Sequence, residues 1–501
     1  MSNNNLYLGI DFGTTGLRIG VFDKHGNEIA FSSETYPTKN EKPGYATQNP
    51  EDWWQALIKA TNKLIDNGIN PEDIKALAVD FHSCSVVLCN SDSKVLYDSL
   101  IWMDVRASKE NDEINLKTNQ ELSAEWMPAK LLWLKRNMPE LYNKAQVFCE
   151  AQDWLNYRLT KTWSININCS VNWGYNAENK SFDKDFYEKI GLKDALNKFP
   201  NKNVYAVGDV IGKLDKDVAN LLGLNENTIV VCGGIDSSIG ILGMNSIKDN
   251  QLALCTGSSN LAMVLTKKPL FNLNKINLGP HHLIHGYYTD YRGQTASGSI
   301  INWAKRNLYS ELDNDSAYKI MDEKAKEIPI GANGLLVLDY FQGNKHPYLD
   351  GDVRGMIYGL SLSHSKDHIY RAILEGICFE TAHLIYQFEE KGRKIEEINL
   401  SGGLSKSDLF LNILADVTNK KINVPENSEC SCLGSAIVAC FGDKQYPDLL
   451  SACDNMVRYS KEIYPNIDNH HKYQKLFELY LQIYPQFSDF FKTISETFKS
   501  L

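Results

Sequence analysis

The chain of 501 residues contains the same short pattern twice, about half its length apart. The first copy is Leu6–Ile10 followed by Asp11–Gly16, and the second is Gln251–Leu254 followed by Cys255–Ser259. Each copy predicts a strand, a turn rich in Gly, Thr and Ser, and a second strand. Amides and hydroxyls in such turns converge on phosphate oxygens. The repeat therefore predicts two duplicated domains that hold a nucleotide in a cleft between them.

Length and charge narrow the classes of protein. A chain of this length exceeds one hydrophobic core, so two or three domains are expected. The net charge is −10 and the pI is about 5.6, which argues against a broad surface for nucleic acid or an anionic membrane. There is no signal-peptide pattern and no apolar run that would span a bilayer, and the 11 cysteines are scattered without paired spacing. We therefore expect reduced thiols and a cytoplasmic location; a homodimer is left open.

The order of predicted elements indicates the fold. Three strands, a helix and a further buried strand form the opening of a ribonuclease-H-like or actin-like domain, and the pattern restarts from Asp249. The predicted pieces are strands Leu6–Ile10, Arg18–Asp23, Glu28–Glu34 and Ile74–Asp80, and a helix from Asn49. We expect an α/β protein of two such domains, 1–246 and 247–501, with the main boundary near Met244–Asp249.

Asp11 and the turn that follows it suggest a metal-dependent phosphate site. The turn would hold terminal phosphates, and the Asp11 carboxylate would help to hold Mg²⁺ through water. The plain alternative is an ordinary hairpin that contains glycine. The second copy has Cys255 in the place of Asp11, so only one half would supply a carboxylate.

Asp236 is the strongest candidate for a catalytic group. It follows the apolar strand Thr228–Cys232 and two glycines, and it precedes Ser237 and an apolar helix. The plain alternative is a helix cap. Amides and the helix dipole at this position predict an ionised carboxylate of low pKa. Such a weak base suffices for phosphoryl transfer, in which the attacking hydroxyl needs orientation more than early deprotonation.

Three further segments carry weaker signals. Ser401-Gly402-Gly403 predicts a strand-to-helix junction that a base and ribose could approach. The small residues of Cys432–Ala436 suit close helix packing between domains. His281, His282 and His285 lie in a segment with Gly279, Pro280 and Gly286, so no helix presents them together and a metal site is not expected there.

These motifs together resemble the FGGY family of carbohydrate kinases. Asp11–Thr15, Gly233–Asp236, Cys255–Ser258 and Ser401–Gly403 occur in the family's order, and Gly355–Glu375 closely matches the second family signature. Pro128–Leu134 matches the first signature only in part. The resemblance covers nearly the whole chain and implies two actin-like domains, ATP with Mg²⁺, and a sugar or polyol in the cleft.

The resemblance also implies site residues. Asp236 would be the general base, and Asp11 and Asp236 would lie near the metal. The residues implied for ATP and its phosphates are Gly13, Thr14, Thr15, Arg18, Thr256, Gly257, Ser258, Gly298, Asn302, Gly402, Gly403 and Ser407.

The sugar-facing loop after the Ile74–Asp80 strand indicates the substrate. Its sequence, Asp80–Ser85, has neither the Gln-Met-His pattern of xylulokinases nor the Gln-Arg-Glu pattern of glycerol kinases. It looks more like ribulokinases, as do Trp102–Ala107 and Leu338–Asn344. This favours a ketopentose, ribulose before xylulose, with a polyol such as erythritol or glycerol as the alternative. The residues expected on the sugar are Asp80, His82, Ser83, Cys84, Trp102, Asp104, Lys130 and Asp236.

Each sugar-facing residue has a plain alternative. His82 could be a core histidine, Asp80 a turn former at a strand end, and Trp102 a core residue. The sequence-level hypothesis is an ATP-dependent sugar kinase that yields sugar phosphate and ADP. Its rivals are an actin-like or chaperone-like ATPase, because a fold does not set a function, and a silent sugar-binding protein.

Overall fold

The computed structural model describes residues 5–176, 179–200, 203–268, 270, 283–284, 286–313 and 316–500. His281, His282 and His285 lie outside the described residues. The chain divides into two compact units. Unit 1 comprises Met1–Asn245, Thr266–Thr289 and Glu429–Val457, and unit 2 comprises Ser246–Leu265, Asp290–Ser428 and Arg458–Leu501. The chain therefore first leaves unit 1 after Asn245 and returns to it twice, with Thr266–Thr289 and with Glu429–Val457.

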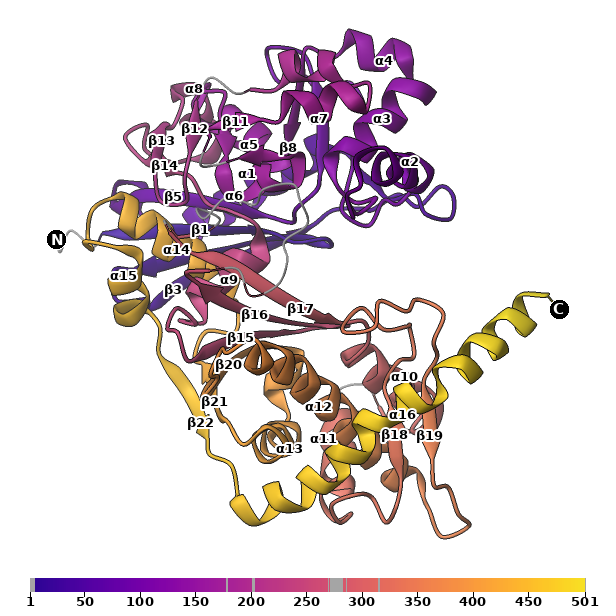
Figure 1. The fold of residues 1–501 in the computed structure, drawn as a ribbon. Helices are drawn as coiled ribbons and strands as arrows, with labels where there is room; N and C mark the ends of the chain where they lie inside the picture. The colour runs from indigo at the N-terminus through magenta and orange to yellow at the C-terminus, as the bar shows by residue number, and fades with distance from the viewer. Residues whose placement is uncertain are drawn as a thin grey trace. The chain divides into compact units, whose positions relative to one another are not determined.

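A six-stranded mixed sheet forms the centre of unit 1 (Figure 1). In spatial order its strands are β13 (Val210–Lys213), β14 (Ile229–Val231), β5 (Ile74–Phe81), β1 (Leu6–Phe12), β2 (Gly16–Asp23) and β3 (Glu28–Thr35). β1, β2 and β3 pair antiparallel, whereas β5 is parallel to both β1 and β14. All of β1 is buried, as expected for a strand covered on both faces.

Helices from distant parts of the chain pack on this sheet. α1 (Pro50–Asp66) begins at Asn49, whose side chain accepts a hydrogen bond from the Glu51 amide, and it packs on β2 and β3. α14 (Cys430–Gly442) packs on β1, β5 and α9 (Asp236–Gly243). The small residues of α14 thus serve close packing within unit 1.

The other elements of unit 1 surround this core. A four-stranded sheet contains β4 (Thr47–Gln48), β7 (Ser99–Leu100), β6 (Val86–Cys89) and β8 (Val147–Glu150). The remaining helices are α2 (Ser108–Thr118), α3 (Met127–Asn137), α4 (Pro139–Lys144), α5 (Ala151–Thr160), α6 (Ile167–Ser170), α7 (Lys184–Lys189), α8 (Lys216–Leu222) and α15 (Leu449–Met456). The short strands are β9 (Ile165–Asn166), β10 (Tyr175–Asn176), β11 (Ser181–Phe182) and β12 (Val204–Tyr205). Single 3₁₀ turns are η1 (Pro71–Asp73) and η2 (Val171–Trp173), and η3 (Lys193–Lys198) is longer.

Unit 2 repeats the sheet of unit 1. Its strands, in spatial order, are β17 (Tyr288–Gln294), β16 (Asn260–Thr266), β15 (Gln251–Thr256), β20 (Glu397–Gly402), β21 (Lys421–Pro425) and β22 (Tyr459–Ile463). β15 is antiparallel to β16 and parallel to β20, as β1 is antiparallel to β2 and parallel to β5. The predicted duplication of a ribonuclease-H-like α/β domain is confirmed by this match of strand order and direction.

The helices of unit 2 include the two longest of the described chain. The helices of this unit are α10 (Gly298–Leu308), α11 (Ala317–Lys326), α12 (Lys366–Glu390), α13 (Asp408–Thr418) and α16 (Ile467–Ser500), with the turn η4 (Gly403–Lys406). The two longest are α12 and α16. β18 (Leu336–Leu338) and β19 (Met356–Tyr358) form a small hairpin. α16 is the long yellow helix at the end of the chain in Figure 1. Within the described residues, no helix combines the length and the apolar character needed to cross a membrane.

Candidate functional site

A cluster of buried carboxyl groups lies at the end of β1 in unit 1. Asp11 of β1 is in register with Asp80 of β5 and with Arg18 of β2. Arg18 Nη1 donates to Asp11 Oδ2 at 2.9 Å. Asp80 Oδ2 accepts from Ser435 Oγ of α14 at 2.6 Å, while Asp80 Oδ1 accepts no hydrogen bond. One buried oxygen of the cluster therefore has no hydrogen-bond donor, and the Asp80 carboxyl lies beside that of Asp11.

Burial and mutual repulsion raise the pKa of each of these carboxyl groups. Burial raises the pKa of Asp11, and burial together with the Asp11 charge raises the pKa of Asp80 well above its usual value. For Asp236, burial and then the Asp11 charge raise the pKa to about 7. The predicted low pKa of Asp236 is therefore wrong, because desolvation and a like charge outweigh the helix N-terminus.

Asp236 is the first residue of α9 and does not cap it. The N-cap position is Ile235, and the Asp236 carboxylate accepts from the amide of Ser237 at 2.6 Å. Asn168 Oδ1 accepts from the Ile235 amide at 2.7 Å and fixes the start of the helix. The side chain of Asp236 is thus available for a role other than capping.

Side chains from three separate segments hold the first turn, Gly13–Thr15. The Tyr36 hydroxyl donates to the carbonyl of Gly13, and Gln48 Nε2 donates to the carbonyl of Thr14 at 2.7 Å. Trp102 Nε1 donates to Thr14 Oγ1 at 3.0 Å. These hydrogen bonds to the carbonyls of Gly13 and Thr14 fix the position of the turn. Sequence reasoning missed Tyr36 and Gln48, which no local motif marks.

The Asp80–Ser85 loop is held by buried polar contacts. Lys130 Nζ donates to the carbonyls of Cys84 and Ile101, each at 2.7 Å, and the Ser85 amide donates to Glu150 at 2.9 Å. Cys84 adopts φ of 60°, a left-handed conformation that costs free energy in a residue other than glycine. Lys130, which is fully buried, therefore stabilises the shape of this loop.

His82 lies in the same loop and keeps one ring nitrogen without a partner. Its Nδ1 lies 2.7 Å from Ser85 Oγ, and its buried Nε2 has no hydrogen-bond partner. Burial, and then the charge of Lys130, lower its pKa to about 3. His82 is therefore a neutral imidazole at physiological pH.

Of the other residues expected on the sugar, Asp104 has its carboxylate occupied. It accepts from Arg106 Nη2 at 2.6 Å and from the Ala46 amide at 2.7 Å, and the Arg106 guanidinium lies 3.8 Å from the centre of the Tyr45 ring. Asp104 and Lys130 thus have internal partners. The Trp102 side chain is 39% exposed, Ser83 is half-buried, and Cys84 is buried.

In unit 2 the second turn, Gly257–Ser259, is exposed and is supported by the start of α10. The amides of Ser297 and Ser299 donate to the carbonyl of Ser258 at 2.9 and 3.2 Å, and the amide of Gly298 donates to that of Gly257 at 3.1 Å. A Cβ on Gly298 would lie 2.4 Å from the Gly257 oxygen. Gly298 is therefore required for this close approach, and its amide holds the turn by donating to the Gly257 carbonyl.

The junction at Ser401–Gly403 lies beside the same turn. Thr256 of β15 is in register with Gly402 of β20, and Thr256 Oγ1 donates to the Ser401 carbonyl at 2.7 Å. Gly402 has φ of 97°, and a Cβ there would lie 1.8 Å from the Thr256 oxygen, so only glycine fits. The exposed Gly403 follows it.

Two further residues expected on the nucleotide have local partners in unit 2. Ser407 caps α13 by accepting from the Phe410 amide at 3.0 Å. Asn302 is exposed on α10 and accepts from the Tyr318 hydroxyl at 2.6 Å. Each position is compatible with the predicted role, but each side chain already makes a hydrogen bond inside the unit.

The two sheets carry different chemistry at equivalent positions. Asp11 opposite Asp80 in unit 1 corresponds to Cys255 opposite Ser401 in unit 2. Among the described residues, no group of three or more His, Cys, Asp or Glu side chains is arranged to hold a metal ion by itself. A cation at the unit 1 carboxyl groups would therefore need oxygen ligands from water or substrate as well.

Comparison with known proteins assigns both halves of the chain to one family. The N-terminal and C-terminal domain models of the FGGY family of carbohydrate kinases match residues 6–243 and 252–442. A xylulose kinase of Bacillus subtilis (strain 168) is 29% identical over 497 residues, covering 96% of this chain and 97% of that protein. A ribulokinase of Geobacillus thermodenitrificans (strain NG80-2) is 25% identical over 531 residues, covering 96% and 94%.

Solved structures share the fold. A gluconate kinase from Lactobacillus acidophilus has a TM-score of 0.86 at 24% identity, covering 98% of this chain and 99% of that chain. A xylulose kinase from the same organism has a TM-score of 0.85 at 23% identity, covering 98% and 99%.

Proposed function

The chain belongs to the FGGY family of carbohydrate kinases, and we propose that the sugar it phosphorylates is a ketopentose, xylulose or ribulose. As a member of this family the protein is a sugar kinase that transfers a phosphoryl group from ATP. The observation that supports a ketopentose is the likeness, over nearly the whole chain, to proteins named xylulose kinase and ribulokinase. The Asp80–Ser85 and Trp102–Ala107 segments support the same class.

The two halves would divide the work. In this proposal 1–246 binds the sugar and carries the catalytic carboxylate, whereas 247–501 binds the nucleotide. The exposed turn Gly257–Ser259 would hold phosphate oxygens with the amides of Ser258 and Ser259, because the Gly257 amide already donates to the Ser259 carbonyl. Thr14 and Thr15 of the first turn stay the residues predicted for the terminal phosphate. Gly402 and Gly403 would let the nucleotide approach the backbone.

Mg²⁺ fits the residues of unit 1 as a water-linked ion. The Asp11 charge raises the pKa of Asp236, and a cation near both carboxyl groups would offset this repulsion. Asp11 and Asp236 would hold the ion through water, with the remaining ligands from ATP. When bound, Mg²⁺ would neutralise charge that develops on the transferred phosphoryl group.

Asp236 would orient the attacking hydroxyl and accept its proton. Without a cation its pKa is about 7, above that of an ordinary aspartate, and bases work best when their pKa is near the working pH. Its position at the first residue of α9, with Ser237 as the amide donor, fixes the direction of the carboxylate. Arg18 would keep the neighbouring Asp11 charge balanced.

The sugar would bind to the polar atoms that have no internal partner. His82 Nε2 and Asp80 Oδ1 are buried and without hydrogen bonds, and leaving such atoms unpaired costs free energy that a sugar hydroxyl would recover. Trp102 would form a wall of the pocket. Lys130 and Asp104 would act by shaping the loops, since each already has internal partners.

One assay tests the proposal. The purified protein receives MgATP with xylulose and ribulose isomers, gluconate, erythritol or glycerol, and ADP release is followed. The expected result is the strongest stimulation by one pentulose. Strongest stimulation by a polyol or by gluconate overturns the ketopentose assignment, and turnover that no sugar changes contradicts the kinase activity itself. A cytoplasmic location and a homodimer stay predictions.

A further inference from the structure

Beneath the Gly257–Ser259 turn, a row of buried polar side chains leads away from the site. Ser297 Oγ lies 3.2 Å from the carbonyl oxygen of Gly257 and 2.7 Å from Asn260 Oδ1. Asn260 Nδ2 donates to Gln294 Oε1 at 2.9 Å. Ser297, Asn260 and Gln294 are all buried. The backbone of the turn is thus connected to the end of β17.

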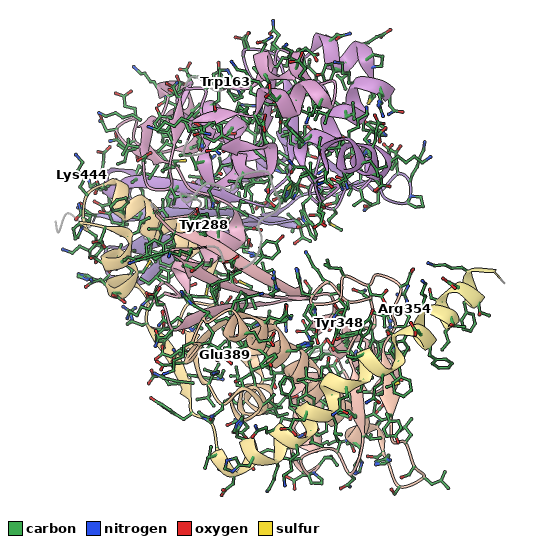
Figure 2. All side chains as sticks on the ribbon, viewed as in Figure 1. Trp163, Tyr288, Tyr348, Arg354, Glu389 and Lys444 are labelled. Atoms are coloured by element: carbon green, nitrogen blue, oxygen red, sulfur yellow. The ribbon has the colours of Figure 1, made fainter. Side chains whose placement is uncertain are left out.

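The row continues from Gln294 to the C-terminal helix. Gln294 Nε2 donates to Asp339 Oδ2 at 2.7 Å. The Tyr480 hydroxyl of α16 lies 2.7 Å from Asp339 Oδ1 and 2.9 Å from Glu380 Oε2 of α12. One turn further along α16, Tyr484 stacks on Tyr348 with ring centres 3.9 Å apart; Tyr348 is labelled in Figure 2. These contacts fix α16 to the groups that orient Gln294.

The orientation of Gln294 depends on both of its ends. Its amide nitrogen faces the Asp339 carboxyl, and its amide oxygen accepts from Asn260 and lies 3.2 Å from Thr381 Oγ1. Buried polar groups of this kind specify geometry, because every lost partner leaves a desolvated atom. Burial, and then the Glu380 charge, raise the pKa of Asp339 well above its usual value. Without the Tyr480 hydroxyl, Asp339 and Glu380 would lose the group they share.

We propose that Tyr480 is a positioning residue for nucleotide binding, and that it acts through Asp339, Gln294, Asn260 and Ser297 on the Gly257–Ser259 turn. This inference rests on the proposed nucleotide site at that turn. Loss of the Tyr480 hydroxyl shifts the buried carboxyl pair and, through Gln294, the support of the turn. The nucleotide affinity then falls while the affinity for sugar, assigned to unit 1, stays unchanged.

Tyr473 is a matched control on the same helix. It is a buried tyrosine seven positions before Tyr480, and its hydroxyl lies 3.1 Å from Glu375 Oε1 of α12. It also accepts from Arg371 Nη2 at 2.7 Å. Arg371 donates to the carbonyl of Ala325, and Glu375 accepts from the amide of Gly331. These hydrogen bonds do not lead to the Gly257–Ser259 turn. Tyr473→Phe therefore removes an equivalent hydroxyl from the same α12–α16 contact.

The test compares Tyr480→Phe with Tyr473→Phe in the full-length enzyme. We measure KM for ATP, KM for the best sugar, ADP affinity by titration calorimetry and the melting temperature. For Tyr480→Phe, KM for ATP and the Kd for ADP are expected to rise roughly fivefold, the factor that follows from one net hydrogen bond. KM for sugar should stay within about twofold, as should every constant of Tyr473→Phe.

Gln294→Leu tests the same path from its middle. It should weaken ADP binding to a similar degree, and the double variant Tyr480→Phe with Gln294→Leu should be no weaker than the worse single variant, because groups on one path are not additive. If Tyr480→Phe does not fold, Gln294→Leu alone tests the inference. Its KM for ATP should rise while its KM for sugar stays unchanged. Equal constants for the Tyr480 and Tyr473 variants, or additive effects, overturn the inference. An inactive wild type that still binds ADP would contradict the proposed function instead.

Discussion

The indole Nε1 of Trp102 donates a hydrogen bond to Thr14 Oγ1 at 3.0 Å. The sequence assigned Trp102 to a sugar pocket and Thr14 to the phosphates, and the structure places these two side chains in contact within unit 1. The Trp102 loop is itself held by the buried pair Asp104 and Arg106. A sugar that contacts Trp102 would therefore also fix the hydroxyl of Thr14.

Trp102→Phe should lower kcat more than it changes KM for the sugar. Phenylalanine keeps an apolar ring but loses the donor to Thr14, so kcat is expected to fall roughly fivefold. Thr14→Val should give at least as large a fall, because it also removes the hydroxyl proposed for the terminal phosphate, and the double variant should show little loss beyond that of Thr14→Val alone. Steady-state kinetics of the three variants provide the check. Fully additive losses would show that the contact has no role in turnover.

Asp236→Asn should nearly abolish turnover and leave ATP binding intact. Asparagine keeps the shape of the side chain but cannot accept the proton, so kcat is expected to fall by roughly 10²- to 10⁴-fold. Asp217→Asn is the control, because Asp217 is an exposed aspartate in the first turn of α8. Sugar-dependent ADP release and nucleotide titration measure both effects. Near-normal turnover in Asp236→Asn would exclude this residue as the base.

Lys130→Met should destabilise the protein and weaken sugar binding through the Asp80–Ser85 loop. The substitution leaves the buried carbonyls of Cys84 and Ile101 without their donor, at an expected cost of about 2–4 kcal/mol in the free energy of unfolding. Lys135 on the same helix is half-exposed and pairs with Asp194, so Lys135→Met should cost under about 1 kcal/mol. Urea unfolding and the sugar KM test this. Equal stability of the two variants would contradict the support role of Lys130.

His82→Gln should reduce the loss of stability at low pH. The pKa of His82 falls from 6.5 to about 3 on folding because of burial and the charge of Lys130. The unfolded chain therefore binds a proton below pH 6.5 that the folded protein does not, and stability is lost as the pH falls from there toward 3. Between pH 7 and pH 5, the wild type should lose about 2 kcal/mol more than the variant. Unfolding is measured for both proteins at pH 7 and pH 5. An equal change in the free energy of unfolding between these pH values in the wild type and the variant would refute a buried neutral His82.

Local sequence patterns predicted the elements that local physics determines. The two hairpins, the helix that starts at Asn49 and the placement of Asp236 at the start of a helix follow from turn residues and periodicity, and the structure confirms them. In each instance the decisive residues lie within a few positions of one another.

Contacts between distant segments could not be predicted in this way. Tyr36 and Gln48 support the first turn from outside any motif, and Ser435 reaches Asp80 from a helix near the other end of the chain. The prediction of a low pKa for Asp236 was wrong for the same reason, because the desolvation that raises this pKa comes from neighbours that only the folded chain brings together. Lys130 fits the same account, since its donor bonds go to carbonyls of two separate loops.

Because Glu429–Val457 belongs to unit 1, fragments of the chain cannot be chosen by sequence position alone. α14 covers β1 and β5, so a fragment that stops at residue 246 would expose a face of its central sheet and lack the partner of Asp80. A recombinant N-terminal half should therefore aggregate, and co-expression with the missing segment should restore its solubility. Chimaeras between relatives that exchange the N-terminal segment of unit 1 would likewise have to exchange the coding sequence of Glu429–Val457 with it.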